Sequence, residues 1–319
     1  MFGSARCGTT ITPEYRRHLA GSQGIAMTRK RRRTKEALIT GAIQLSGAAA
    51  VVFVILIFLV LLRDGLPVFR STSLSEFLFG RDWLPLSGVF GTLPLILASL
   101  LVTAGAVVIA IPLGAAVATY IAEVAPPAVK DILKPTVETL AAIPSVVIGF
   151  IGLLALAPLM RNLFNLPTGL TAFTGSVMLA FMALPTIVSI AEDAITAVPR
   201  DYRAASLALG ATRWQTIRMV VLPAARSGIF AGVMLGIGRV IGETMAVLMV
   251  TGNAAVIPHT IFQPVRTMTA TIAAEMGETV HYSEHYFALF AIGLVLFLIT
   301  FVINLLADLA LHRSAVGRA

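Results

Sequence analysis

The chain has 319 residues, of which 57% are hydrophobic and 13% are charged, and its formal net charge is +8. Soluble globular domains average about 45–50% apolar and about 25% charged residues, so this composition excludes an ordinary soluble domain and indicates a protein that folds in lipid. The chain has one cysteine, Cys7, which excludes an intrachain disulfide.

Six apolar segments are long enough to cross a bilayer, for which a helix needs roughly 20 residues. Backbone groups inside a membrane must satisfy their own hydrogen bonds, and segments of this length favour helices over the strands of a barrel. We therefore expect an all-α, polytopic membrane protein with six transmembrane helices. The predicted spans are residues 38–62, 94–122, 135–160, 170–191, 224–250 and 287–310.

The distribution of Lys and Arg between the spans predicts which ends of the helices are cytoplasmic. With the N-terminal end inside, fifteen basic residues lie on the cytoplasmic side: six in residues 29–35, two in 130–134, five in 200–226 and two in 311–319. Only five lie outside. We therefore expect both termini in the cytoplasm. This bias, together with contact to anionic lipid, accounts for the positive charge without a nucleic-acid partner.

Met27 directly precedes the basic run, and residues 1–26 carry no pattern that predicts structure. We expect translation to start at Met27, with residues 1–26 as an upstream extension. The predicted organisation is then a cytoplasmic tail (1–37), the first span (38–62), an external loop (63–91), a core of five spans (92–310) that includes a cytoplasmic loop (194–223) and an external segment (251–286), and a cytoplasmic tail (311–319).

The cytoplasmic loop 194–223 has the pattern of a short helical hairpin. Pro199 suits a helix start, and the alanines and leucine that follow it favour a helix. Gly210 interrupts this pattern, a second helical stretch follows, and Pro223 marks the entry to the fifth span. An amphipathic hairpin that only lies on lipid head groups would share this pattern, so the pattern alone leaves both interpretations open.

The same loop resembles the coupling loop of ABC-importer permeases, whose motif is Glu-Ala-Ala, three residues, Gly, nine residues, Ile, one residue and Leu-Pro. This chain keeps the spacing, although Ala204 stands in the acidic first place and Ser206 in the place of the second alanine. In that family the hairpin docks into a groove on a separate ATP-hydrolysing subunit. The resemblance implies contacts with that subunit at Arg203, Ala204, Ala205, Ser206, Gly210, Leu222 and Pro223.

Two full charges, Arg239 and Glu243, lie in the otherwise apolar stretch 235–250. A charged residue at bilayer depth costs at least about 2.5–3.5 kcal/mol. On a continuous helix the two residues share a face and can pair. One interpretation is a pair that only neutralises itself. The other is a transient anion site, in which the planar guanidinium binds a tetrahedral oxyanion and the carboxylate competes for the guanidinium and loosens that hold.

The segment 236–253 resembles the corresponding span of PstC-type phosphate permeases, as do residues 76–85, 90–103, 141–150 and 261–278. The resemblance implies a type I ABC importer permease of the bacterial cytoplasmic (inner) membrane that moves inorganic phosphate. It also implies transport-pathway roles for Arg239, Glu243 and Thr244, with Glu138 as a weaker candidate that hydration near the membrane boundary would explain equally well.

The family also implies the partners: an extracytoplasmic phosphate-binding protein (PstS-type), a second permease (PstA-type) and a dimer of ATPase subunits (PstB-type). A P-loop needs Gly-Lys followed by Ser or Thr. None of the four lysines has this setting, so this chain is not itself a P-loop ATPase. We therefore expect a transporter subunit without enzymatic activity or cofactor of its own, with ATP and magnesium bound by the ATPase.

Three alternatives compete with this hypothesis: a permease for another oxyanion such as sulfate or molybdate, a stand-alone secondary anion carrier, and a membrane metalloprotease. The last depends on His281, Glu284 and His285, which match H-x-x-E-H and on one helix would place two histidines toward a zinc ion. The only later acid is Asp308, far along the last span, so we expect no metal site.

The predicted external residues 266–278 look helical, with Met268, Ile272 and Met276 on one face. We expect this helix to pack on the outer surface of the bundle. The family resemblance adds a docking surface for the binding protein and an external gate.

Overall fold

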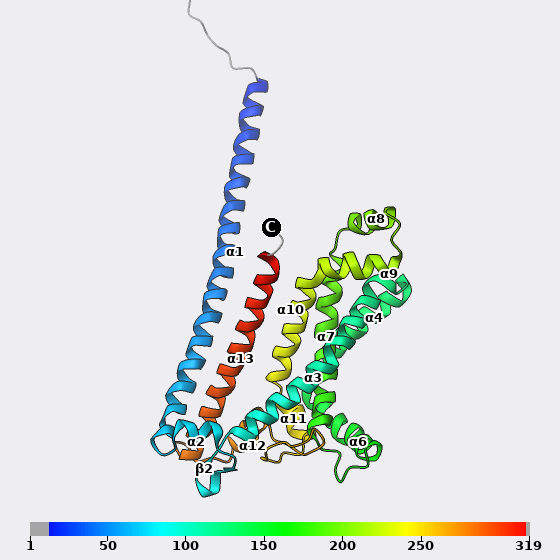
Figure 1. The fold of residues 1–319 in the computed structure, drawn as a ribbon. Helices are drawn as coiled ribbons and strands as arrows, with labels where there is room; N and C mark the ends of the chain where they lie inside the picture. Colours follow the sequence, from blue (N-terminus) through cyan, green and yellow to red (C-terminus); the bar gives the residue numbers. More distant parts are fainter. Residues whose placement is uncertain (1–12, 317–319) are drawn as a thin grey trace, which may run out of the picture. The chain divides into compact units, whose positions relative to one another are not determined.

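The computed structural model describes residues 13–316, with side chains for residues 39–306 and 309. The described chain is helical apart from turns, loops and one small hairpin of strands (Figure 1). It divides into two units, residues 1–60 and 61–319. Cys7 and the last residues of the predicted tail 311–319 lie outside the described part.

Six helical segments of the described chain are apolar and long enough to cross a membrane, which confirms the predicted number. The third observed segment begins later than predicted. The fifth, predicted at 224–250, begins earlier and also ends earlier, because its helix stops at Ile241. The segments are Ile39–Arg70, Leu93–Val124, Ser145–Leu163, Ala172–Thr196, Arg213–Ile241 and Glu284–Leu306.

Most elements follow one another with short connections, and the longest connection covers residues 251–267. The β strands pair as an antiparallel hairpin, with Trp83 opposite Phe90. In chain order the elements are α1 (Pro13–Gly65), α2 (Leu74–Phe79), β1 (Trp83–Leu84), β2 (Val89–Phe90), α3 (Leu93–Thr119), α4 (Pro127–Ala141), α5 (Ser145–Ile151), α6 (Ala157–Leu163), α7 (Ala172–Thr196), α8 (Arg200–Ala208), α9 (Arg213–Thr216), α10 (Leu222–Ile241), α11 (Met245–Val250), α12 (Met268–Glu275) and α13 (Glu284–Val316).

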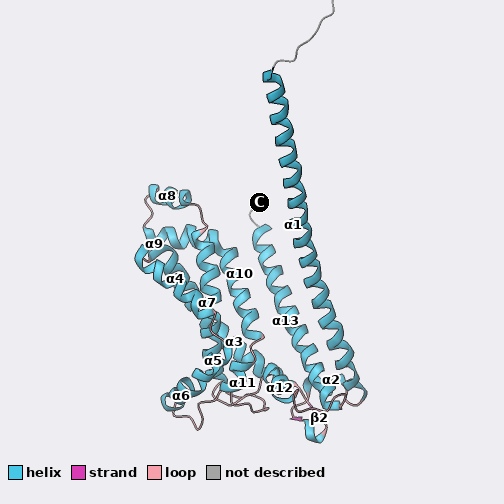
Figure 2. Ribbon diagram, turned by 180° about the vertical axis from the view of Figure 1, so that it is seen from behind, coloured by secondary structure: helices cyan, strands magenta, loops and turns pink. Residues whose placement is uncertain are grey.

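Within the unit 61–319, the connecting elements gather at two opposite ends of the helices. Figures 1 and 2 show α8 and α9 at one end, and α2, the β hairpin, α6 and α12 at the other. The predicted cytoplasmic loop 194–223 therefore lies opposite the predicted external segments 63–91 and 251–286, as an alternating topology requires.

The centre of this unit is α7, which packs along α3 and α10 and is the most buried of the six candidate spans. Small residues bring these helices close together. A Cβ atom at Gly105 would lie 2.4 Å from Ser176 Oγ, and one at Gly236 would lie 2.6 Å from Ile187 Cγ1. Lipid tails are as apolar as the helices, so no hydrophobic force drives helices together in a membrane. Close contacts between small residues are therefore the usual basis of helix packing there.

Three helices widen into a π turn before a proline. The π turns cover Tyr120–Val124, Gly152–Leu156 and Ile217–Val221, and each ends two residues before a proline: Pro126, Pro158 and Pro223. A proline has no N–H to donate to the carbonyl four residues earlier, and its ring clashes with that carbonyl. In all three cases that carbonyl belongs to the middle residue of the π turn. The sequence pattern thus explains where these helices are distorted.

The prediction of one continuous third span, 135–160, is wrong. The chain forms two helices there, because α4 ends at Ala141 and α5 starts at Ser145. Pro144 restricts the residue before it to non-helical conformations and has no N–H to continue the helical ladder. Residues 135–141 therefore belong to a separate helix in which no residue is fully buried.

Charged side chains hold α4 against α7. Glu192 on α7 is only 1% exposed, and its two carboxylate oxygens accept hydrogen bonds from Lys130 and Lys134, each with an Nζ–O distance of 2.7 Å. Lys134 also contacts Asp193, at 2.6 Å. Its hydrogen bonds to Asp193 and Glu192 raise the pKa of the Lys134 ammonium above its usual value. These contacts fix one helix of the candidate site described below.

The helix predicted within residues 266–278 is confirmed as α12. Met268 is buried, and Ile272 and Met276 pack against the same apolar cluster, which includes Phe77 and Leu289. This segment thus packs on the body of the unit 61–319 as predicted.

We expect Gly236→Val to lower the melting temperature of the purified protein in detergent, whereas Gly238→Val should leave it almost unchanged. The added Cβ meets Ile187 at the first position and finds open space at the second. The two variants lie on the same helix and introduce the same residue, so they differ only in this contact. Overpacking of this kind costs typically about 1–3 kcal/mol. Equal melting temperatures for the two variants would show that the α7–α10 contact is not tight.

We also expect Glu192→Gln to destabilise the protein, because it leaves two lysines facing a neutral amide. Breaking a buried ion pair costs roughly 3–5 kcal/mol, and the loss here should fall below that range because the lysine side chains are 30% and 35% exposed. Thermal unfolding would measure it. Asp131→Asn, which removes an exposed carboxylate from α4 between the two lysines, is the control.

Candidate functional site

Arg239, near the end of α10, is partly buried where three helices meet. Its Nη1 donates to Thr186 Oγ1 on α7 at 3.4 Å, and its Nη2 donates to the main-chain oxygen of Ala141 at 3.3 Å. Ala141 is the last residue of α4. The guanidinium therefore touches α4 and α7 only through two neutral acceptors.

No carboxylate compensates this arginine among the described residues. Two other partly buried arginines do pair with acids: Arg203 with Glu123, and Arg266 with Glu275. An arginine keeps its charge in a protein under all ordinary conditions. Arg239 thus places a full positive charge on a predicted membrane-spanning helix with no negative partner in the described part of this chain.

The predicted helical pairing of Arg239 with Glu243 is wrong. Helix α10 ends at Ile241, with Gly242 as its C-cap, and α11 starts only at Met245. Glycine is a weak helix former, and the Glu243 carboxylate instead accepts the backbone N–H of Ala246 in the first turn of α11, at 3.1 Å. No ion pair joins the two side chains, both of which are described.

The two other candidate pathway residues lie in different surroundings. Thr244 is partly buried in the break between α10 and α11, and its hydroxyl donates to the Gly242 carbonyl at 3.2 Å. Glu138 is exposed on α4, where it lines a small cavity together with Lys134 and Glu192. The structure thus brings Arg239, Glu243 and Thr244 to one region around the end of α10, and it places Glu138 one helical turn before Ala141.

The predicted hairpin in residues 194–223 is confirmed. Pro199 is the N-cap of α8, and the second helical stretch begins with α9 after a capping box formed by Thr212 and Gln215. Between them Gly210 has φ = +84°, which favours glycine. The N–H groups of Gly210 and Ala211 close the end of α8 as a Schellman motif.

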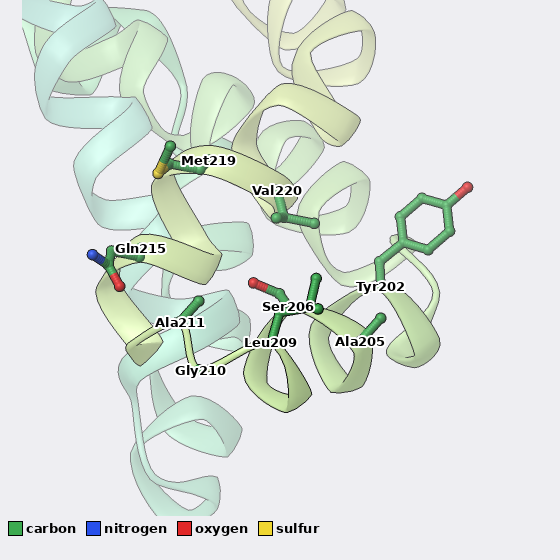
Figure 3. Close-up of a pocket in the computed structure, with 9 residues that line it drawn as sticks. All are labelled: Tyr202, Ala205, Ser206, Leu209, Gly210, Ala211, Gln215, Met219 and Val220. Carbon is green, nitrogen blue, oxygen red and sulfur yellow. The ribbon is translucent and has the colours of Figure 1, made fainter.

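The hairpin encloses a groove of about 670 Å³ between α8 and the start of the fifth span. Figure 3 shows Leu209 and Gly210 at the turn, with Gln215, Met219 and Val220 on the facing helix. The hydroxyls of Ser206 and Thr216 lie 3.0 Å apart and join the two arms of the hairpin. Ala204 and Ala205 are exposed on α8, and Leu209 is 90% exposed. Leu222 and Pro223 are partly buried and follow the π turn.

Arg203 points inward and braces the hairpin. Its Nε donates to Glu123 at 3.0 Å, and its guanidinium also donates to the main-chain oxygens of Val198 and Ile195. These partners lie at the ends of α3 and α7. Of the residues predicted to contact an ATPase, Arg203 thus orients α8 from within, whereas the neighbouring alanines form the outer surface.

The metalloprotease alternative loses the geometry on which it depends. Helix α13 starts at Glu284, and Tyr282 has φ = +62°, so His281 and His285 do not share a helix face. His285 bonds instead to Glu275 at 2.8 Å, in a cluster with Arg266 and the indole N–H of Trp83. No group of three or more potential metal ligands occurs among the described residues.

Sequence reasoning missed the two acceptors of Arg239 and the acids that hold Lys134 and Arg203. Thr186 and Ala141 are 53 and 98 residues away from Arg239, and no local pattern predicts such contacts. A signal did exist for the brace on α4: Lys130 and Lys134 are one helical turn apart, and Glu192 is a charge next to a predicted span.

Known proteins match this chain over most of its length. Residues 110–315 match the family model described as binding-protein-dependent transport system inner membrane component. The "Probable ABC transporter permease protein YqgH" of Bacillus subtilis is 41% identical over 79% of this chain and 83% of its own. A "Phosphate transport system permease protein PstC" of Mesorhizobium japonicum is 37% identical over 76% of this chain and 80% of its own.

The fold resembles that of a solved permease. An inward-facing structure of the MetNI methionine ABC transporter aligns with a TM-score of 0.55 at 18% identity, covering 73% of this chain and 99% of that one. This likeness confirms the type I importer permease fold, and the relatives confirm the resemblance to PstC-type permeases. The chain therefore belongs to the family of binding-protein-dependent transport system inner membrane components, as a multi-pass permease of the PstC type.

Proposed function

We propose that this chain is the membrane-spanning permease subunit of an ATP-driven importer that moves inorganic phosphate across the cytoplasmic membrane, with both termini in the cytoplasm. One observation carries the proposal: where α4, α7 and α10 meet, the Arg239 guanidinium has no carboxylate partner among the described residues. An intramembrane charge without a partner is expensive and marks a functional site by default. The PstC relatives add the identity of the ion.

The guanidinium suits this task. Its planar set of donors matches a tetrahedral oxyanion and forms paired, charge-assisted hydrogen bonds. Its hydrogen bonds to Thr186 and Ala141 are longer than the usual 2.7–3.2 Å, so an anion displaces them at little cost. Phosphate thus finds a donor set that no carboxylate of the described chain occupies.

Glu243 limits how long the anion stays, and Thr244 adjoins it in the break after α10. Their backbone forms the break after α10, so a negative carboxylate lies close in sequence to Arg239 without neutralising it. That charge repels a bound dianion and favours its release, which a transport site needs more than tight binding. This differs from a direct competition within a preformed helical pair.

The partners follow from the surfaces. The hairpin 194–223 presents Ala204, Ala205 and Leu209 to the solvent beside its groove, and we assign this surface to a PstB-type ATPase that binds ATP and magnesium. The segments 63–91 and 251–286 at the opposite end would receive a PstS-type binding protein, and a PstA-type permease would complete the pathway. A stand-alone carrier has no use for such a hairpin, which disfavours that alternative.

Replacing Arg239 by glutamine should abolish phosphate uptake by cells or proteoliposomes that contain the complete complex. Arg239→Lys keeps the charge but not the planar donors, so we expect it to retain a fraction of the uptake. Both variants should still insert and co-purify with their partners. Wild-type uptake by the glutamine variant would exclude Arg239 from the pathway.

Replacing Leu209 by aspartate should remove the ATPase from the purified complex, because it places a charge on the apolar surface proposed to dock. Leu86→Asp is the matched control, since Leu86 is also fully exposed but lies on the β hairpin at the opposite end. Co-purification in mild detergent measures the effect. Retention of the ATPase by both variants would mean that the hairpin surface around Leu209 is not the contact.

A further inference from the structure

The hydroxyl of Thr186 lacks the hydrogen bond to the preceding turn that several other threonines of this protein make. Thr119, Thr251 and Thr271 donate to the carbonyl four residues earlier, at 2.7, 2.8 and 2.9 Å. Thr186 makes no such bond: its oxygen accepts from Arg239, and no acceptor in the described chain takes its hydrogen. The hydroxyl hydrogen is therefore available beside the guanidinium.

The main-chain oxygen of Ala141 supplies a hydrogen-bond acceptor beside the same guanidinium. Ala141 ends α4, and the last carbonyls of a helix have no partner within it. The break at Pro144 prevents the next helix from supplying a donor, and Arg239 Nη2 is the only group in the described chain that donates to this oxygen. Once Arg239 turns to an anion, this carbonyl needs a new donor.

Among the described residues, the site around Arg239 thus combines a positive charge, a hydroxyl hydrogen without an acceptor, and a carbonyl oxygen whose one donor is Arg239 itself. A carbonyl oxygen accepts hydrogen bonds and never donates them. It therefore forms a hydrogen bond with the O–H of a protonated oxyanion. A fully deprotonated oxyanion offers it only lone pairs, which repel its own. An acceptor left without a partner costs about 1–3 kcal/mol, and a site built to pair with a substrate O–H rejects analogues that lack it.

We propose that Thr186 and the Ala141 carbonyl complete the Arg239 site and make it selective for protonated tetrahedral oxyanions, the class of hydrogen phosphate and hydrogen arsenate, over sulfate. Near neutral pH phosphate and arsenate retain a proton, whereas sulfate has none. Arg239 and the Thr186 hydroxyl donate to the deprotonated oxygens, and the Ala141 carbonyl accepts the remaining O–H. This inference rests on the proposed phosphate site at Arg239.

The permease would then select its substrate a second time, after any selection made by a binding protein. The residues that do so come from two helices, α4 and α7, whose separation the Lys130 and Lys134 contacts to Glu192 hold fixed. The selectivity is therefore a property of the α4–α7 packing and not of α10 alone.

The test measures phosphate binding to the purified complex of the permeases and the ATPase without the binding protein, by broadening of the ³¹P resonance of inorganic phosphate. Arsenate and sulfate serve as competitors. We expect arsenate to compete and sulfate to be roughly tenfold or more weaker. Thr186→Val should weaken phosphate binding roughly three- to tenfold, and Thr186→Ser, which restores the hydroxyl, should recover most of it.

Arg239→Gln separates the two proposals. Suppose that Arg239→Gln removes the broadening. If sulfate then competes as well as arsenate in the wild-type complex, or if Thr186→Val binds phosphate like the wild type, the selectivity inference is wrong and the Arg239 site stands. If Arg239→Gln leaves the broadening unchanged, or the wild-type complex shows none, the phosphate site itself is overturned. Thr186→Val is nearly isosteric, and its melting temperature checks that a weaker signal does not come from unfolding.

Discussion

The charge of Arg239 is the constraint on which the account depends. A guanidinium on a predicted membrane-spanning helix costs at least about 2.5–3.5 kcal/mol, and the described chain offers it no carboxylate. The fold supports the charge instead with a hydroxyl and a helix-terminal carbonyl, both neutral and both weakly engaged. A structural role would favour an ion pair such as that of Arg203 with Glu123. Arg203, with its carboxylate partner, stabilises the structure, whereas Arg239, without one in the described chain, can bind an anion.

Prolines place the elements around that charge. Pro144 separates α4 from α5 and so exposes the Ala141 carbonyl, while Pro223 sets the π turn at which the hairpin joins α10. Glycine acts at the other end of α10, where Gly242 ends the helix and allows Glu243 to cap α11 rather than pair with Arg239. The same backbone breaks thus connect the hairpin, the candidate anion site and the segment that leads to α12.

Local patterns were enough to predict the number of spans, the hairpin turn at Gly210 and the helix that begins at Met268, because hydrophobic run length and helix-breaking residues determine them. Pro144 marks the break in the third span, but membrane helices tolerate prolines such as Pro112 and Pro185, so its presence alone did not predict that the helix ends there. The partners of Arg239 were not predictable, since Thr186 and Ala141 reach it only through the packing of α4 and α7 against α10. The expected pair with Glu243 failed because capping of α11 prevailed over helical continuity.

A density map of the assembled transporter during ATP turnover with phosphate would test the central claim most directly. The account predicts a tetrahedral anion in contact with the Arg239 guanidinium in at least one state, close to Thr186, with no carboxylate paired to the arginine in that state. An Arg239 side chain that is paired with an acid of a partner subunit in every state, with the anion elsewhere, would contradict it.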